Sequence, residues 1–100
     1  MKPNELIEEQ NYFFLKYYDK KSKIPKINTV IFVGKNVLTE KKYSKNDEWY
    51  FQDVESYLEY GSFLHMSGIE KREVFALEKK DLSSIYDLSM LIDVLKRIES

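Results

Sequence analysis

Four stretches of the chain have the pattern of apolar and polar positions that is typical of β-strands. Residues 27–33 are β-branched and almost continuously apolar, so they predict a central strand. Residues 12–18 are dense in aromatic side chains, which favour strands. Residues 48–52 alternate between polar and apolar positions, and residues 73–78 read in the same way. The connections in the first half of the chain are too short for the crossovers that parallel strands need. The pattern therefore predicts a small, mostly antiparallel sheet of three to four strands.

Two short helices are predicted in addition. The first begins near Pro3, which suits a first helical turn, and ends near Gln10. A helix is the alternative to a strand for residues 11–18, because Phe13 and Tyr17 continue the spacing of one helical face. The second short helix covers residues 53–60. Its first residue, Asp53, is a good N-cap, and Gly61 follows at the position where a left-handed conformation ends a helix.

The strongest helical pattern lies at the carboxyl end of the chain. Apolar residues recur there every three or four positions, at Leu82, Ile85, Leu88, Ile92, Leu95 and Ile98. We expect an amphipathic helix over about residues 83–99, capped by Asp81 or Ser84 and packed on one face of the sheet. The fold class predicted for the chain is therefore α+β, with residues 1–100 forming a single domain.

Charge is distributed unevenly along the chain, although the formal net charge is only −1. Residues 12–45 contain nine lysines against Asp19 and Glu40. Residues 46–69 contain five carboxylates and neither Lys nor Arg. The same segment carries the single Trp and three Tyr. An acidic surface with aromatic side chains favours a basic protein partner, since carboxylates accelerate association and aromatics supply contact area.

Periodicity divides this acidic segment into a core set and an exposed set. The residues predicted to face the core are Trp49, Phe51, Val54, Tyr57 and Leu58. The residues predicted to be exposed and to bind the partner are Asp47, Glu48, Tyr50, Asp53, Glu55, Glu59 and Tyr60.

No catalytic or cofactor motif is present, so we expect a protein that is not an enzyme. The chain has no Cys, and His65 is its single His, so neither a thiolate metal site nor a Cys–His nucleophile pair exists. We interpret His65 as structural and expect no cofactor and no metal. The amino-terminal residues have no apolar core of a signal peptide, and the longest apolar run is too short to span a membrane. These features predict a cytoplasmic protein that does not enter a membrane.

The lysine-rich residues 16–45 are the basis of an alternative function. Tyr17, Tyr18, Phe32 and Tyr43 lie among the lysines, and stacking combined with phosphate contacts is how single-stranded nucleic acids are bound. Against this alternative, the isoelectric point is about 5.9 and the segment contains no Arg. Nucleic-acid binding, or a role as an accessory subunit, is therefore the second hypothesis.

The chain resembles the small bacterial immunity proteins of contact-dependent growth inhibition and related toxin–immunity systems. The resemblance is one of general character, carried by chain length, the absence of catalytic motifs, the segment from Trp49 through Asp53 to Gly61, and a closing helix over residues 88–98. It implies a cytoplasmic protein that binds one cognate toxin, often a nuclease, and blocks its active site. A nuclease cleft is basic because it binds phosphate, so an acidic-aromatic patch would complement it.

Overall fold

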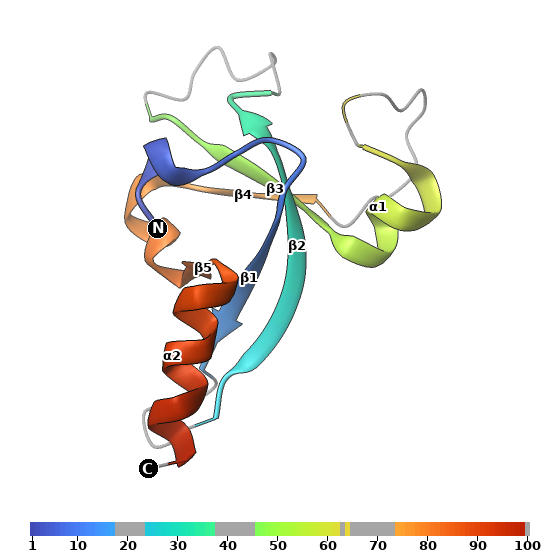
Figure 1. Ribbon diagram of the computed structural model, residues 1–100. Coiled ribbons are helices and arrows are strands. Elements are labelled where there is room, and N and C mark those ends of the chain that lie inside the picture. Colours follow the sequence, from blue (N-terminus) through green and yellow to red (C-terminus); the bar gives the residue numbers. More distant parts are fainter. Residues whose placement is uncertain (18–23, 38–45, 63, 65–73, 100) are drawn as a thin grey trace.

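One antiparallel sheet forms the centre of the molecule (Figure 1). The structure is a computed structural model that describes residues 1–17, 24–37, 46–62, 64 and 74–99. Within these residues the sheet has five strands in the order β4-β3-β2-β1-β5. The strands are β1 (Asn11–Lys16), β2 (Lys26–Lys35), β3 (Trp49–Asp53), β4 (Val74–Leu77) and β5 (Ile85–Tyr86). The α+β class and the antiparallel pairing are confirmed, with more strands than predicted.

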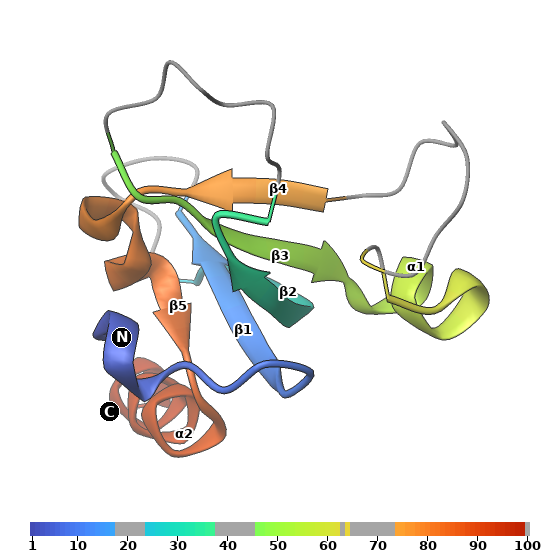
Figure 2. The same cartoon turned by 90° about the horizontal axis from the view of Figure 1, so that it is seen from above.

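Helical segments surround the sheet at its ends. They are η1 (Pro3–Glu5), α1 (Val54–Tyr60), η3 (Lys79–Ser84) and α2 (Leu88–Glu99). The α1 helix follows β3 directly and contacts β2 and β3, whereas α2 contacts β1 and β5 (Figures 1 and 2). The two α-helices therefore lie at different ends of the sheet.

The core follows from the register of the central strands. Phe32, Phe51 and Phe75 are paired directly across β2, β3 and β4, so their side chains share one face of the sheet. Their rings are in contact, with centroids 5.4 Å apart for Phe32–Phe51 and 5.7 Å apart for Phe51–Phe75. The buried members of the same cluster are Tyr12, Val30, Phe32, Trp49, Phe51, Leu82 and Ile85. The prediction that Trp49 and Phe51 face the core is confirmed.

A bulge at the end of β2 changes the pairing with β3. The register shifts between Phe32 and Gly34, so that Gly34 lies opposite Tyr50 and Lys35 opposite Trp49. Gly34 has a φ of 148°, a backbone conformation that residues other than glycine rarely adopt. The bulge places the Lys35 ammonium 5.4 Å from the centre of the Trp49 ring.

The amino-terminal segment corrects one prediction and confirms another. Residues 11–16 form a strand, but the predicted helix to Gln10 is wrong, since η1 ends at Glu5. The reason is the backbone of β2: Glu9 N donates to Phe32 O at 2.8 Å, and Phe32 N donates to Gln10 O at 3.1 Å. These bonds hold residues 9–10 along β2 instead of in a helix. The Met1 amino group also donates to the carbonyl oxygens of Leu82 and Ile85.

The carboxyl-terminal helix begins later than predicted. Residues 79–86 form η3 and β5, in which Ile85 pairs with Phe14, and only residues from Leu88 onward form α2. The predicted caps Asp81 and Ser84 are therefore wrong. Asp87 takes this role, because its carboxylate accepts a hydrogen bond from Met90 N at 2.8 Å.

Candidate functional site

Most of the seven residues predicted to form one acidic surface lie at two ends of β3. Asp47 and Glu48 precede the strand, Tyr50 lies within it, Asp53 ends it, and Glu55, Glu59 and Tyr60 belong to the helix that follows (Figure 2). An extended strand rises about 3.3 Å per residue, so roughly 20 Å separates the two groups. Each end is therefore considered by itself.

At the first end, Asp47 is engaged in contacts within the protein. Its carboxylate lies 3.2 Å from Lys35 Nζ and accepts a hydrogen bond from Asn36 Nδ2 at 3.0 Å. Asn36 also exchanges hydrogen bonds with the backbone of Glu48, which directly precedes β3. The hydrogen bond from Asn36, followed by the hydrogen bond and charge of Lys35, lowers the pKa of Asp47 below its ordinary value. Asp47 therefore holds the ends of β2 and β3 together.

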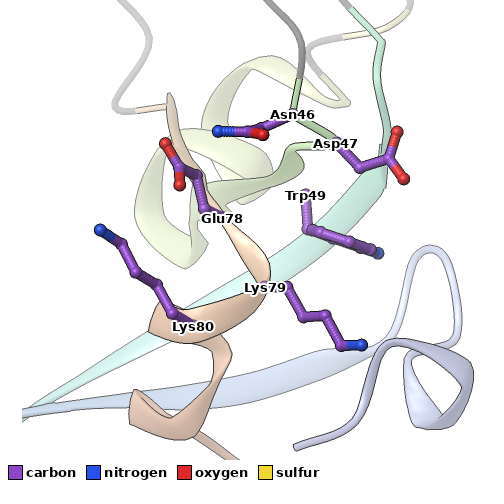
Figure 3. A pocket seen from close by; sticks show the side chains of 6 residues that line it. All are labelled: Asn46, Asp47, Trp49, Glu78, Lys79 and Lys80. Atoms are coloured by element: carbon purple, nitrogen blue, oxygen red, sulfur yellow. The ribbon is translucent and has the colours of Figure 1, made fainter.

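A pocket of about 400 Å³ lies beside these residues (Figure 3). Its lining consists of Asn46, Asp47, Trp49, Glu78, Lys79 and Lys80. In Figure 3 Lys80 and Glu78 lie on one side of the pocket and Lys79 and Asp47 on the other, so each side carries both charges. Trp49 is only 4% exposed and offers little apolar surface. Since the two ammonium groups balance the two carboxylates, the lining favours no ligand of one charge.

Two of the predicted orientations in the acidic segment are wrong. Tyr50, predicted to be exposed, is buried in a strand that has a neighbour on each side, where it pairs with Gly34 and Ala76. Leu58, predicted to face the core, is 79% exposed. Its place is taken by Ser56, which is buried, because α1 projects from the end of the sheet and turns a different face inward (Figure 1).

The second end is built on α1, and both of its predicted caps are confirmed. The Asp53 carboxylate accepts a hydrogen bond from Glu55 N at 3.1 Å. At the other end, Gly61 has a φ of 81°, and its N–H donates to Tyr57 O at 2.8 Å. These two caps fix the length of the helix at seven residues.

A fully buried amide anchors this short helix to the sheet. The side-chain nitrogen of Gln52 donates to Ser56 Oγ at 3.1 Å and to Gly61 O at 3.0 Å. Gln52 belongs to β3, and its side chain has no exposed surface. An isolated helix of seven residues is not stable in water, so α1 depends on this anchor.

Glu9 is a functional candidate that the sequence did not reveal. The Tyr57 hydroxyl donates to the Glu9 carboxylate, although the two residues are 48 positions apart. Glu9 has a positive φ of 67° and is held against β2 through Phe32. The hydrogen bond to Glu9, together with some burial and the negative charge of Glu9, raises the pKa of Tyr57 above its ordinary value. No local sequence signal connects the two segments.

The resulting cluster is called the α1 surface here. It consists of Glu9, Glu55, Leu58, Glu59 and Tyr60, all of which are exposed. Glu55 and Glu59 are one helical turn apart, and Leu58 lies at i+3 from Glu55. The α1 surface therefore presents one large apolar side chain, Leu58, beside the carboxylate of Glu55.

Other predicted features lie wholly or partly outside the described residues. His65 is among these, as are six lysines, three within residues 18–23 and three within residues 38–45. In the described part of the chain, no three side chains suited to metal binding lie together. Within the same residues, no helix combines the length and apolar character needed to cross a membrane.

Comparisons of the chain with protein-family models, with curated proteins and with solved structures found no match. The function therefore has to be inferred from the geometry of the described residues.

Proposed function

We propose that this chain is a non-catalytic binding protein whose α1 surface recognises a basic protein partner. The resemblance to small bacterial immunity proteins makes a cognate toxin domain, such as a nuclease, the partner class that fits best. The proposal moves the interface from the whole segment 47–60 to the end of the molecule that carries α1.

The observation that supports this proposal most directly is the exposure of Leu58. It is 79% exposed and flanked on the helix by Glu55 and Glu59. Like charges one turn apart destabilise a helix by about 0.2–0.5 kcal/mol, and an acid in the last turn opposes the helix dipole. Glu55 in the first turn suits the helix dipole, but neither Leu58 nor Glu59 stabilises such a short helix. A partner with an apolar recess bordered by Lys or Arg would give all three a role.

The anchoring of α1 supports the proposal as well. The Gln52 bonds, the Asp53 cap and the Gly61 turn fix the helix before any partner binds. A prearranged surface loses less conformational entropy on binding, which favours affinity. Glu9 adds a further carboxylate from a distant segment that is held equally firmly.

The test is to identify the partner with matched variants and then to measure its binding. Wild-type protein and the Glu55→Lys/Glu59→Lys variant are immobilised side by side, and proteins retained only by wild type are purified. We expect a basic protein domain. In stopped-flow measurements at low salt, Glu59→Lys should slow its association about tenfold or more. Leu58→Ala should weaken the complex by about 1 kcal/mol or more, mainly through faster dissociation.

Asp81→Lys is the matched control, since Asp81 is an exposed acid of η3 and the charge change is the same. It should leave the association rate within about twofold of wild type, because it lies outside the interface. Equal effects of Glu59→Lys and Asp81→Lys would mean that only net charge matters and would contradict the proposed interface. Retention of single-stranded RNA instead of a protein would favour the lysine-based alternative.

A further inference from the structure

The strand β4 forms one edge of the sheet (Figure 2). It pairs with β3 on one side, and no strand of the described residues pairs with it on the other. Its residues, Val74–Leu77, include neither Lys nor Pro, which commonly protect an exposed edge from pairing with another chain. At the opposite edge, β5 has only two residues, and the carbonyl oxygen of Ile85 accepts a hydrogen bond from the Met1 amino group. Of the two edges, β4 is therefore the one suited to further pairing.

The hydrogen bonds around β3 determine which of its main-chain groups face β4. Asn36 N donates to Glu48 O, so the main-chain groups of Glu48 face β2. Because these groups alternate in direction along an extended chain, those of Trp49 and Phe51 face β4. Phe32 agrees with this assignment, since its N–H and C=O bond to the amino-terminal segment although it pairs with Phe51.

The same alternation assigns the direction of each residue in β4. Leu77 and Phe75 are opposite the two residues of β3 that face β4, so their main-chain groups are bonded within the sheet. The N–H and C=O groups of Val74 and Ala76 therefore point out of the edge. Phe75 and Leu77 pack against the core cluster but are only half-buried. A further extended strand would bond to the outward groups and cover these two side chains.

We propose that β4 pairs with β4 of a second copy of this chain, antiparallel about a two-fold axis perpendicular to the sheet, so that the two sheets become one. The strand is complementary to itself when Ala76 lies opposite Ala76 of the other copy. The outward groups of the two Ala76 residues then bond each other, and those of Val74 meet Glu78, which continues the extended backbone of β4.

The side chains favour this occupant and this register. A perpendicular two-fold axis keeps the core faces of both sheets on the same side, so Phe75 of each copy lies opposite Leu77 of the other. Apolar side chains that are half-buried in one copy thus meet across the new strand pair. A two-fold interface uses the same surface on both copies, and β4 meets this requirement in its main-chain groups and in its side chains.

Sedimentation velocity on the full chain, from about 5 to about 500 μM, tests the dimer. Wild type should shift from monomer to dimer within this range. Ala76→Pro and Val74→Pro each remove an outward N–H and leave the bonds to β3 in place, so each should raise the dimer dissociation constant about tenfold or more. Val74 begins the strand, where Pro is tolerated, so its variant keeps the fold even if Ala76→Pro does not. Phe75→Pro is the contrasting variant: it removes an N–H bonded to β3 and should lower the urea midpoint of unfolding.

Single cysteines test the register, since the chain has no Cys of its own. Ala76→Cys places cysteines on directly opposite residues with Cα atoms about 5.5 Å apart, which a disulfide can span. Val74→Cys is the matched control on the same edge, because its two copies lie four residues apart along the paired strands, roughly 13 Å. Under mild oxidation, Ala76→Cys should form the intermolecular disulfide about tenfold faster or more.

Three results would overturn the proposal: a wild-type chain that stays monomeric throughout, a dimer unaffected by both proline variants, or equal cross-linking of the two cysteine variants. A monomer whose β4 edge instead pairs with a strand of another protein belongs to the first of these. The inference does not rest on the α1 surface, and Glu59→Lys should leave the dimer unchanged.

Discussion

Gly34 is the residue on which the pairing of β2 with β3 depends. It follows the bulge that brings Lys35 opposite Trp49, and its φ of 148° is a conformation that an L side chain adopts only with strain. A Cβ at this position would lie 2.6 Å from Val37 Cγ1. The backbone and the neighbouring side chain both require glycine here.

Replacing this glycine should therefore destabilise the fold. Gly34→Ala should lower the free energy of unfolding by about 2–4 kcal/mol, because strain and a steric clash add. Gly61→Ala is the comparison, since a Cβ there meets nothing within 4 Å, and the backbone strain of φ 81° with ψ −175° should alone cost about 1–3 kcal/mol. Urea denaturation of the two variants measures the difference. Equal losses of unfolding free energy in the two variants would show that the Val37 side chain moves away from the new Cβ without an energetic cost.

Tyr57 joins α1 to the amino-terminal segment through its hydroxyl. The neutral hydroxyl donates to the Glu9 carboxylate, and this contact raises the pKa of Tyr57 above the model-peptide value of 10.0. Because the folded-state pKa is raised, the contact contributes stability fully below pH 10 and loses it as pH rises through the folded-state pKa. Ionised Tyr57 would repel Glu9.

An alkaline titration tests this link. The Cζ resonance of Tyr57, assigned with a Tyr57→Phe variant among the eight tyrosines, should titrate above pH 10. Glu9→Gln should lower the midpoint, because it removes the negative charge and the strong acceptor. A Tyr57 midpoint that Glu9→Gln leaves unchanged would contradict the contact.

At the scale of elements, local signals predicted the position of α1 but not which of its faces is buried. Asp53 and Gly61 are capping residues whose effect depends only on neighbouring backbone, so the ends of the helix were correct. The inward face depends on Gln52 and on the way the helix leaves the sheet, and these are tertiary features. For this reason the pattern wrongly predicts that Leu58 faces the core, and it does not indicate that Ser56 is buried.

The start of α2 was wrong for a related reason. Leu82 and Ile85 are three residues apart, a spacing that fits an α-helix and a 3-10 turn equally well. What decides between them is the pairing of β5 with β1, in which Ile85 meets Phe14 across some seventy residues of chain. The contact between Glu9 and Tyr57 could not be predicted for the same reason, since the two residues are 48 positions apart. Sequence pattern captured the local elements, and long-range pairing determined the rest.

Gln52 is the link between sheet and α1, so its removal should release the helix. Gln52→Leu takes away both donated hydrogen bonds and leaves the buried Ser56 Oγ without its donor, at about 1–3 kcal/mol. The amide of Gly61, bonded to Tyr57 O, should exchange with solvent much faster in this variant. Ser56→Ala removes only one acceptor and should have a smaller effect. Exchange at Gly61 unchanged by Gln52→Leu would mean that α1 is held by other contacts.

At the scale of the whole molecule, the α1 surface and α2 lie apart. The α1 surface lies beyond the end of β3, and α2 lies beside β1 and β5 on a different part of the sheet (Figures 1 and 2). The two helices contact different strands. Changes at well-separated sites without common partners are additive in free energy within about 0.5 kcal/mol.

This separation predicts that a change on α2 leaves binding of the basic partner intact. Ile92→Gln should bind the partner with an affinity within about twofold of wild type, whereas Glu59→Lys should weaken binding. Titration calorimetry measures the affinity of each variant. A loss of affinity in Ile92→Gln as large as that in Glu59→Lys would mean that the two ends of the molecule do not act separately.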